Sequence, residues 1–509
     1  MASFDFYGES YFNIGGRWVD CDSRPVSEET AHSLDIMYPP EVVKKMNKPV
    51  RKATVRESKV IPFPGALHKK ARARIYEPIV NLTTEQQNAM DILESGANVF
   101  LSGEAGTGKS YVLNEFIRRY EKKKSIIVCA PTGIAAINVG GATLHRVFKA
   151  PIGVIRPGEY NSKPDDAVIK ADIVIIDEIS MCRFDLFEYI IRTIRCAESL
   201  RQQELNRDAL TNGTELVVNA PKQIIVVGDF FQLAPVIAGN DREILFKYWD
   251  ENKYGCGFSF ASDLWWELGF KPVVLTEIIR QRGDDSYIEN LNKIRVGDPS
   301  GIGWFNAHVS RRPIEGAINL CGTNRAADTI NTEESEALPG EFVEYYSQIN
   351  GQVNESDKAT SDILALKVGM QVMTLVNDMD AGYQNGSLGK VVALHEDMVE
   401  VRLDNGRLVK VIPYVWEIYG YEIQGERLEK VVLGDFKQIP IKVAYAITIH
   451  KSQGQTYSKV NVAPNCFAEG QLYVALSRAQ SIDGMSLQYA IARNSLRTST
   501  AVKEFYEGR

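Results

Sequence analysis

The residues with the clearest chemical signature form a glycine-rich run, GEAGTGKS, at 103–110. The run matches the pattern G-x-x-x-x-G-K-[ST], in which backbone N–H groups surround phosphate oxygens, the lysine reaches the β- and γ-phosphates and the hydroxyl holds Mg²⁺. A strand-like run precedes it and a helix-like run follows it, so the helix N-terminus would add its dipole to the anion site. The run therefore predicts a site for ATP and Mg²⁺, formed by Gly103, Ala105, Gly106, Thr107, Gly108, Lys109 and Ser110.

Two adjacent acids, Asp177 and Glu178, end the apolar run DIVIIDE. A carboxylate at a strand end beside a phosphate loop is the usual partner of Mg²⁺, and a second acid can orient or deprotonate the attacking water. Taken alone, the pair would equally suit an exposed turn after a strand. Beside a phosphate loop, it predicts that the bound nucleotide is hydrolysed.

Two more polar side chains follow apolar runs. Gln232, in GDFFQLAPV, is a neutral hydrogen-bonding group suited to sensing a γ-phosphate without competing for its charge. Arg280 closes LTEIIRQ at a predicted domain border, where a guanidinium can enter a neighbouring phosphate site as an arginine finger. Judged by position alone, such an arginine is more often a surface residue.

The elements that must position these residues alternate between strands and helices. From residue 98 onward, five β-branched runs are separated by helical stretches: NVFLSG, SIIVCAP, DIVIIDE, QIIVVGD and PVVLTE. Near-continuous apolar strands are buried on both faces, which predicts an α/β fold with a doubly wound parallel sheet. Function in such a sheet lies at the carboxyl ends of the strands, where the polar residues above collect.

A second α/β pattern without a phosphate loop begins near residue 316. Its apolar runs are AINLCG, VMTLVND, IPIKVAYAITIHKSQG, KVNVAPN and MSLQYA. Residues 387–414 interrupt it with alternating polar and apolar positions around Asn405-Gly406, a hairpin turn signal. This predicts a small inserted β-barrel, with a decorative hairpin as the alternative. The polar segment 197–220 is interpreted as a loop.

Composition excludes several classes of protein. The chain has 509 residues, of which 44% are hydrophobic and 24% charged, so it is globular and neither disordered throughout nor collagen-like. Seven cysteines form no C-x-x-C pair, which disfavours zinc, iron–sulfur and disulfide frameworks and fits a reducing compartment. No apolar run suits a membrane helix, and the first residues lack signal-peptide features. We expect an intracellular protein, cytoplasmic or nucleoid-associated, without a membrane partner.

The net charge of -7 first argues against a nucleic-acid partner, but the charge is unevenly distributed. Residues 1–43 carry a balance of -6, and residues 44–74 carry +10. A basic belt therefore lies within an acidic total. It suits a solvated connector and a nucleic-acid contact equally well.

An ordered series of motifs runs along the chain: LTTEQQ, GEAGTGKS, APTGIAAINVGGATLHRVF, DEISM, GDFFQLAPV, LTEIIRQ, AITIHKSQGQT and YVALSRA. The series resembles that of the superfamily-1B DNA helicases of the petite-integration-frequency type, with RecD and Dda as more distant relatives. The resemblance covers about residues 82–490, and the stretch DLFEYIIRTIR resembles that family's signature segment.

The resemblance implies two RecA-like P-loop NTPase domains, with ATP in the cleft between them and a small SH3-like β-barrel inserted in the second. We expect an N-terminal extension over 1–80, a first RecA-like domain over 81–279 with a small wedge insertion at about 146–170, a second RecA-like domain over 280–386 and 436–509, and the SH3-like insertion over 387–435.

The resemblance also implies roles for individual residues. Gln86 would contact the adenine, Asp177 would coordinate Mg²⁺ with Ser110, and Glu178 would activate water. Gln232 would couple the γ-phosphate to the grip on DNA, and Arg280 with Arg478 would supply arginine fingers. The single-strand path would be lined by Thr132, Thr143, His145, Asn324, His450, Lys451, Ser452 and Gln453.

These implications predict an ATP-dependent DNA helicase that moves 5′-to-3′ on single-stranded DNA and unwinds duplex or structured DNA in replication, repair or recombination. Its partners would be single strands and duplex junctions, and we expect a monomer. Two alternatives stay open: an RNA helicase of superfamily 1, and a nucleotide-gated switch that grips nucleic acid without unwinding it.

Overall fold

The computed structural model describes residues 82–508 except 238, 279–283, 379 and 425–426, together with short strands before residue 82. Residues 1–59 and 60–509 form two separate units. The first contains an antiparallel sheet of β1 (Ser3–Phe6), β2 (Glu9–Ile14) and β3 (Arg17–Val19). The basic belt lies outside the described residues, apart from β4 (Lys59–Ile61) and β5 (Lys69–Lys70). Within the described part, no helix is long and apolar enough to cross a membrane.

The first α/β domain is built on a six-stranded sheet whose strand pairs are all parallel. Each of the five runs expected from the sequence forms one of its strands, so the predicted parallel sheet is confirmed. The order is β11 (Lys271–Leu275), β6 (Val99–Gly103), β10 (Gln223–Val227), β9 (Ile173–Ile176), β7 (Ile126–Ala130) and β8 (Ala142–Thr143).

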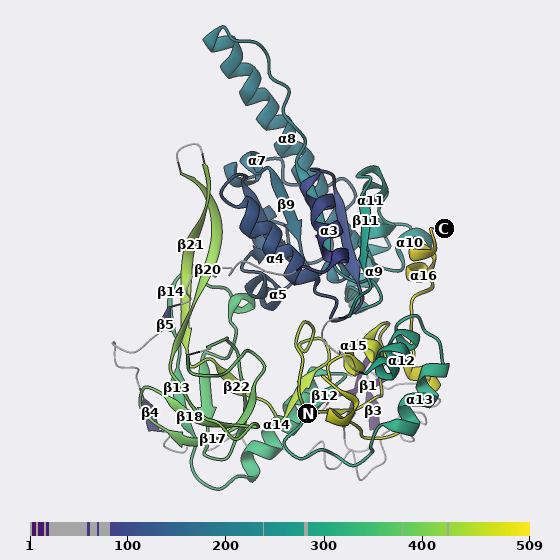
Figure 1. The fold of residues 1–509 in the computed structure, drawn as a ribbon, viewed down its shortest axis with the longest axis vertical. Coiled ribbons are helices and arrows are strands. Elements are labelled where there is room, and N and C mark those ends of the chain that lie inside the picture. The colour runs from purple at the N-terminus through teal and green to yellow at the C-terminus, as the bar shows by residue number, and fades with distance from the viewer. Residues whose placement is uncertain are drawn as a thin grey trace. The chain divides into compact units, whose positions relative to one another are not determined.

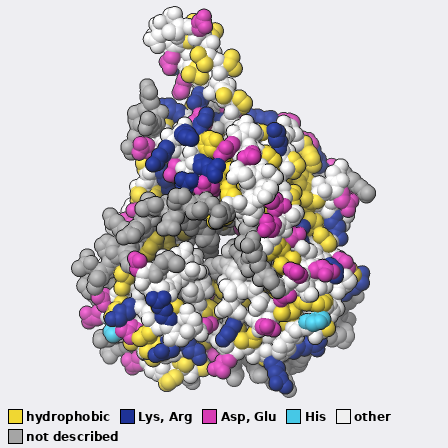
Figure 2. All heavy atoms as spheres, viewed as in Figure 1, with side chains coloured by type: hydrophobic (Ala, Val, Ile, Leu, Met, Phe, Trp, Pro, Cys, Tyr) yellow, Lys and Arg dark blue, Asp and Glu magenta, His cyan; other side chains and the backbone are white. Residues whose placement is uncertain are grey.

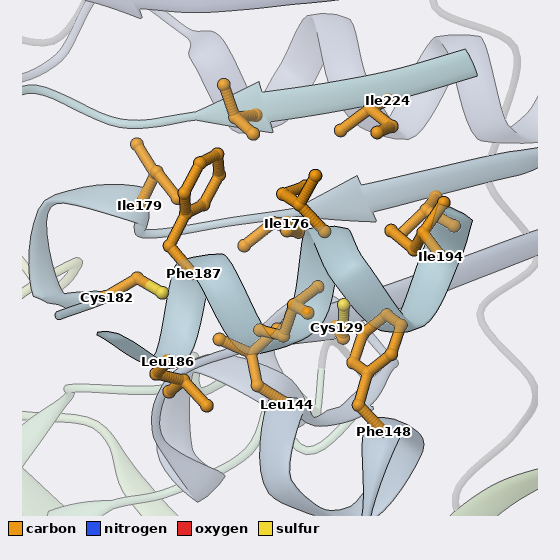
Figure 3. Packing of buried hydrophobic residues seen from close by; sticks show 14 of the residues in the cluster. Cys129, Leu144, Phe148, Ile176, Ile179, Cys182, Leu186, Phe187, Ile194 and Ile224 are labelled. Atoms are coloured by element: carbon orange, nitrogen blue, oxygen red, sulfur yellow. The ribbon is translucent and has the colours of Figure 1, made fainter. Parts of the chain in front are cut away.

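Successive strand residues enter two different cores, one on each face of this sheet. Ile175 and Ile225 pack against the helices α3 (Thr84–Glu94) and α4 (Lys109–Tyr120). Ile176 and Ile224 point to the opposite face, where they share a core with Phe187 (Figure 3). Burial on both faces is why the strands are apolar at every position rather than at alternate ones. The helices of this second face include α6 (Leu144–Phe148), α7 (Asp166–Lys170) and α11 (Asp263–Glu267).

Helix α8 (Phe184–Asn212) is longer than its sequence suggested. The interpretation of 197–220 as a loop is wrong for 197–212, because the helix continues to Gly213, which has a φ of 64° and ends it, and it holds for 214–220. Residues 197–212 contain no glycine or proline, so their polarity marks exposure rather than a break. The end of α8 protrudes in Figure 1, and Figure 2 shows hydrophobic side chains on that protrusion, which carries the exposed Leu210.

The second α/β domain has a four-stranded parallel sheet, in the order β23 (Ala446–Thr448), β12 (Ile318–Cys321), β24 (Val460–Val462) and β25 (Met485–Leu487). The run VMTLVND is not part of it. That run forms β16 (Gln371–Thr374), which pairs antiparallel with its neighbours, so its assignment to the α/β pattern was wrong. A short apolar run does not distinguish the two kinds of sheet. The helices of this domain are α12 (Asp285–Arg295), α13 (Ser300–His308), α14 (Asn324–Ala337) and α15 (Gln471–Leu476).

Residues 343–443 form a region of antiparallel strands, called the barrel region after the predicted insertion. The hairpin predicted at Asn405-Gly406 is confirmed, and Gly406 has a φ of 84° there. One core joins side chains from Tyr345 to Ile441, a wider span than the predicted 387–435. The SH3-like class and the domain bounds stay predictions. The strands are β13 (Val343–Tyr346), β14 (Gln348–Gly351), β15 (Ile363–Leu366), β16, β17 (Leu388–Leu394), β18 (Val399–Leu403), β19 (Leu408–Val411), the long hairpin of β20 (Tyr414–Gln424) and β21 (Arg427–Gln438), and β22 (Ile441–Val443).

The C-terminal helix α16 (Thr500–Glu507) packs against the first α/β domain, beside α10 (Glu251–Tyr254) and α11 in Figure 1. Phe505 stacks on Phe260 with ring centroids 4.5 Å apart, and the Tyr506 hydroxyl lies 2.7 Å from Ser102 Oγ. The chain therefore crosses from the second domain back to the first near its end. Two further short helices are α5 (Gly133–Asn138) and α9 (Gly239–Leu245).

Candidate active site

The phosphate loop joins β6 to α4 and is shaped by glycine. A Cβ atom at Gly103 would lie 2.4 Å from the Leu275 carbonyl oxygen, and Gly108 has a φ of 87°, which a side chain disfavours. The Lys109 ammonium donates to the carbonyls of Gly103 (2.8 Å) and Glu104 (2.9 Å). Burial lowers the pKa of Lys109, while the negative charges of Asp229 and Glu178 oppose that shift. Phosphate oxygens are the natural replacement for these two carbonyl acceptors.

Helix α3 is tied to the phosphate loop through Gln86. This buried side chain completes a capping box with Thr83, and its Nε2 donates to the Thr107 carbonyl at 3.3 Å. The motif LTTEQ is thereby brought to the edge of the nucleotide site, as the sequence predicts. The contact of Gln86 with adenine stays a prediction.

Asp177 and Glu178 follow β9 and face the phosphate loop lysine. Glu178 has a φ of 51°, a left-handed conformation that costs energy for a side-chain-bearing residue and is typical of functional sites. Burial, together with the neighbouring Glu178 charge, raises the pKa of Asp177 to about 7. Burial also raises the pKa of Glu178, with the positive charges of Lys109 and Arg478 opposing it.

This pair of carboxylates, with Asp177 buried and Glu178 half-buried, suits a divalent cation. Mg²⁺ takes oxygen ligands, commonly one or two protein groups together with nucleotide phosphates and water. Asp177 offers a carboxylate, and Ser110 offers an exposed hydroxyl in the first turn of α4. Among the described residues, no cluster of three or more His, Cys, Asp or Glu side chains would hold a metal without the nucleotide. The residues present therefore fit a magnesium ion that arrives with ATP.

Gln453, from the second α/β domain, completes the cluster around Glu178. Its Nε2 donates to Glu178 Oε2 at 3.0 Å and to Gln232 Oε1 at 3.2 Å. Gln453 was predicted to line the single-strand path, yet here it contacts the predicted water-activating acid and the predicted γ-phosphate sensor. The hydrogen bonds run directly between the two α/β domains.

Sequence reasoning missed two further links between the domains. Arg295, the last residue of α12, forms a two-pronged ion pair with buried Asp229 at 2.9 and 3.1 Å and lies over the Phe231 ring at 4.4 Å. The pair raises the pKa of Arg295, against the effect of burial. The Tyr473 hydroxyl accepts the backbone N–H of Ala105, in the phosphate loop, at 2.9 Å. Asp229 lies in the motif GDFFQLAPV and Tyr473 in YVALSRA, whereas no local sequence pattern marks Arg295.

Of the two predicted arginine fingers, the described residues include Arg478; Arg280 lies outside them. Arg478 is buried, and its guanidinium donates to the carbonyls of Val474, Ser452 and Gln455 and to the Ser477 hydroxyl. Burial lowers the pKa of Arg478, and the Glu178 charge opposes this. The guanidinium thus lies near the cluster while bound within its own domain, and its role as a finger stays a prediction.

Comparison with known proteins supplies the family. A family model described as PIF1-like helicase matches residues 81–297. The ATP-dependent DNA helicase Pif1 of Campylobacter jejuni is 31% identical over 456 residues, which cover 81% of this chain and 94% of the relative. The chain belongs to the PIF1-like helicase family.

Solved structures agree with this assignment. The crystal structure of Bacteroides sp Pif1 in complex with ADP-AlF4 matches with a TM-score of 0.73 at 34% identity, covering 84% of this chain and 97% of the other. Bacteroides Pif1 bound to ssDNA, with the same identity and coverage, matches with a TM-score of 0.56. The two α/β domains of this PIF1-like helicase are accordingly RecA-like, as predicted.

The residues predicted for the single-strand path lie at carboxyl ends of strands in both RecA-like domains. Thr132 and Thr143 follow or end β7 and β8, and each caps the next helix by accepting a backbone N–H. Ser452 is buried, with its hydroxyl donating to the Ile449 carbonyl. The remaining members are the half-buried His145 and His450, whose pKa values burial lowers, the exposed Asn324 and the exposed Lys451.

Proposed function

We propose that this PIF1-like helicase hydrolyses ATP in the cleft between its RecA-like domains and uses that energy to move 5′-to-3′ along single-stranded DNA, unwinding duplexes. The observation that carries the proposal is the hydrogen-bonded chain Gln232–Gln453–Glu178. It joins a hydrolytic carboxylate of the first domain to a loop of the second. Hydrolysis of a nucleotide beside Glu178 therefore acts directly on the segment that follows β23.

The chemistry begins with the phosphate loop. Lys109 exchanges its two carbonyl acceptors for phosphate oxygens, and Gln86 holds α3 against the loop at the base side. When bound, Mg²⁺ supplies positive charge to the phosphate oxygens. Glu178 orients the attacking water and accepts its proton, and the rise of its pKa on burial makes it a stronger base. Gln232 reports the presence of the γ-phosphate to Gln453.

Translocation follows from two strand-binding surfaces, one on each RecA-like domain, on either side of the nucleotide cleft. Thr132, Thr143 and His145 belong to the first RecA-like domain, and Asn324, His450 and Lys451 belong to the second. Neutral and cationic donors of this kind bind phosphates and sugars without reading sequence. Closing the cleft on ATP and opening it after hydrolysis moves one surface relative to the other. Alternating grips then convert each hydrolysis event into a step along the strand.

Relatives support the choice of substrate. Bacteroides Pif1 has been solved bound to ssDNA, and the Campylobacter jejuni relative is named as a DNA helicase. We infer that this chain acts on single strands and duplex junctions during replication, repair or recombination inside the cell, and that it works as a monomer.

The test compares duplexes with a 5′ tail, a 3′ tail or no tail, each made with a DNA or an RNA loading strand. We expect ATP-dependent displacement of the 5′-tailed DNA duplex and little activity on the others. Glu178→Gln is the control, since it should bind ATP and single strands but displace nothing. Activity restricted to RNA tails would favour an RNA helicase, and brisk hydrolysis without displacement would favour a nucleotide-gated switch.

A further inference from the structure

A buried ion pair joins the first RecA-like domain to the barrel region, away from the nucleotide. Arg146, in α6, donates through Nη2 to Asp357 Oδ2, across 211 positions of sequence. Their side chains are 15% and 7% exposed. Arg146 directly follows His145 and lies three residues after Thr143, two members of the predicted strand path. No motif of the nucleotide site includes either partner.

The pair lines a large cavity. The cavity has a volume of about 1160 Å³ and lies between the first RecA-like domain and the barrel region. Its wall includes Thr143 in β8 with Gly141 just before it, the cation Lys122, and the carboxylates Asp378 and Asp380. Small residues let a strand backbone approach closely, and cations attract its phosphates.

Asp357 is held in place by its own turn. It ends the 3-10 turn Glu355–Asp357, where its Oδ2 also accepts the Asn354 backbone N–H at 2.8 Å, and the turn packs against α5. The neighbouring charges pair locally, because Lys358 contacts Glu355 and Asp362. Asp357 is thus the acid of this turn that reaches across to the other domain.

The chemistry of the pair indicates that a phosphate could take the place of the Asp357 carboxylate. A guanidinium binds carboxylates and phosphates through the same planar donors, so a carboxylate can occupy the place of a phosphate. A phosphodiester oxygen would offer Arg146 Nη2 the acceptor that Asp357 Oδ2 now offers. A single strand that enters beside Thr143 would meet this arginine next.

We propose that Arg146 binds a backbone phosphate of the single strand, and that Asp357 occupies it as a phosphate mimic until a strand displaces the carboxylate. The inference rests on the proposed function, since it needs a strand bound along Thr143 and His145. The Asp357 carboxylate then competes with the strand and lowers the affinity of the protein for single-stranded DNA. The competing explanation is a clamp that simply fastens the barrel region to the first domain.

The two explanations predict opposite signs for one substitution. If Asp357 competes with the strand, removing its charge makes binding tighter. If the pair is a clamp, the same change leaves strand binding equal or weaker, because only stability is lost. The control is Glu355→Gln, an exposed acid of the same turn that pairs with Lys358 rather than with Arg146.

The experiment measures fluorescence anisotropy of a labelled oligodeoxythymidine with the full chain, without nucleotide, over a range of salt. We expect Asp357→Asn to bind about five to ten times more tightly, as suits the release of one charged hydrogen-bonded pair. Glu355→Gln should match the wild type. Arg146→Gln should bind more weakly and lower the slope of log affinity against log salt by about one. The double variant should resemble Arg146→Gln.

Unchanged or weaker binding by Asp357→Asn would overturn the proposal, as would a normal salt slope for Arg146→Gln with an unaltered melting temperature. Arg146→Lys, which keeps the charge, shows whether a fold defect explains any loss. Strand displacement by the wild type is measured in parallel. If the wild type binds strands but does not unwind, the proposed function fails while the sign of the Asp357→Asn effect still decides this inference.

Discussion

The first RecA-like domain is held by the rest of the chain at two places that differ in construction. On the nucleotide side, Gln453, Tyr473 and Arg295 reach buried groups of the phosphate loop and strand ends through direct hydrogen bonds. On the barrel side, the Tyr421 hydroxyl bonds the backbone of Val128 at 3.0 and 3.1 Å, and the pair Arg146–Asp357 borders a cavity.

The difference reflects what each side must do. Phosphoryl transfer depends on positions that are correct within a fraction of an ångström, so its contacts are short and largely buried. A strand-binding surface must admit and release a polymer, so it tolerates a cavity and replaceable contacts. We therefore expect substitutions on the nucleotide side to abolish activity and substitutions on the barrel side to tune it.

The largest expected effect comes from Lys109→Ala. Losing the ammonium removes the charge that the phosphate loop directs at the nucleotide, so strand-stimulated ATPase should fall by at least about a hundredfold. Steady-state phosphate release measures this, and the melting temperature checks the fold. Near-normal turnover would mean that the nucleotide binds elsewhere and that the contacts on the nucleotide side do not serve catalysis.

Arg295→Gln should have the next largest effect. Loss of the ion pair with Asp229 frees the loop that carries Gln232, so stimulation of ATPase by single strands should fall by about tenfold or more while nucleotide binding persists. Arg295→Lys keeps the charge but not the two-pronged geometry and should be intermediate. The pairing is tested with Asp229→Asn: if the double variant is no worse than either single one, the two residues act together. Additive losses would show that they act separately.

Asp177→Asn should stabilise the protein when nucleotide and divalent cations are absent. Burial raises the pKa of Asp177 from 3.8 to about 7, so the folded state resists ionisation that the unfolded chain accepts. The cost is absent below about pH 4, grows as the pH rises to about 7 and is constant above that. The melting temperature of the variant should therefore exceed that of the wild type at pH 8 and match it at pH 4. A lower melting temperature at pH 8 would contradict the burial argument.

Tyr421→Phe should have the smallest effect. It removes one hydroxyl that both accepts from and donates to Val128 on the barrel side, which should cost about 1 kcal/mol of stability. Urea denaturation measures the loss. ATPase should be unchanged, because neither Tyr421 nor Val128 takes part in the hydrogen bonds described around Lys109 and Glu178. A large fall in ATPase would show that hydrolysis depends on the contacts of the barrel side as strongly as on those of the nucleotide side.

Prediction from sequence succeeded where a feature depends on a short stretch of neighbouring residues. The phosphate loop, the acids after β9 and the five strands of the first sheet all follow local patterns of glycine, charge and β-branched residues. It failed for the second half of α8, where polarity was taken for a loop, and for β16, whose apolar run fits either kind of sheet.

The amino-acid sequence by itself determined the local features: a glycine-rich loop between a strand and a helix, two adjacent carboxylates after a strand, and an ordered series of motifs that identifies a PIF1-like helicase. Only the tertiary structure decided that Gln453 contacts Glu178, that Arg295 holds Asp229 and that Asp357 covers Arg146. The reason is physical. Local patterns encode backbone conformation and charge, whereas a contact between residues 66, 211 or 275 positions apart depends on how whole domains pack.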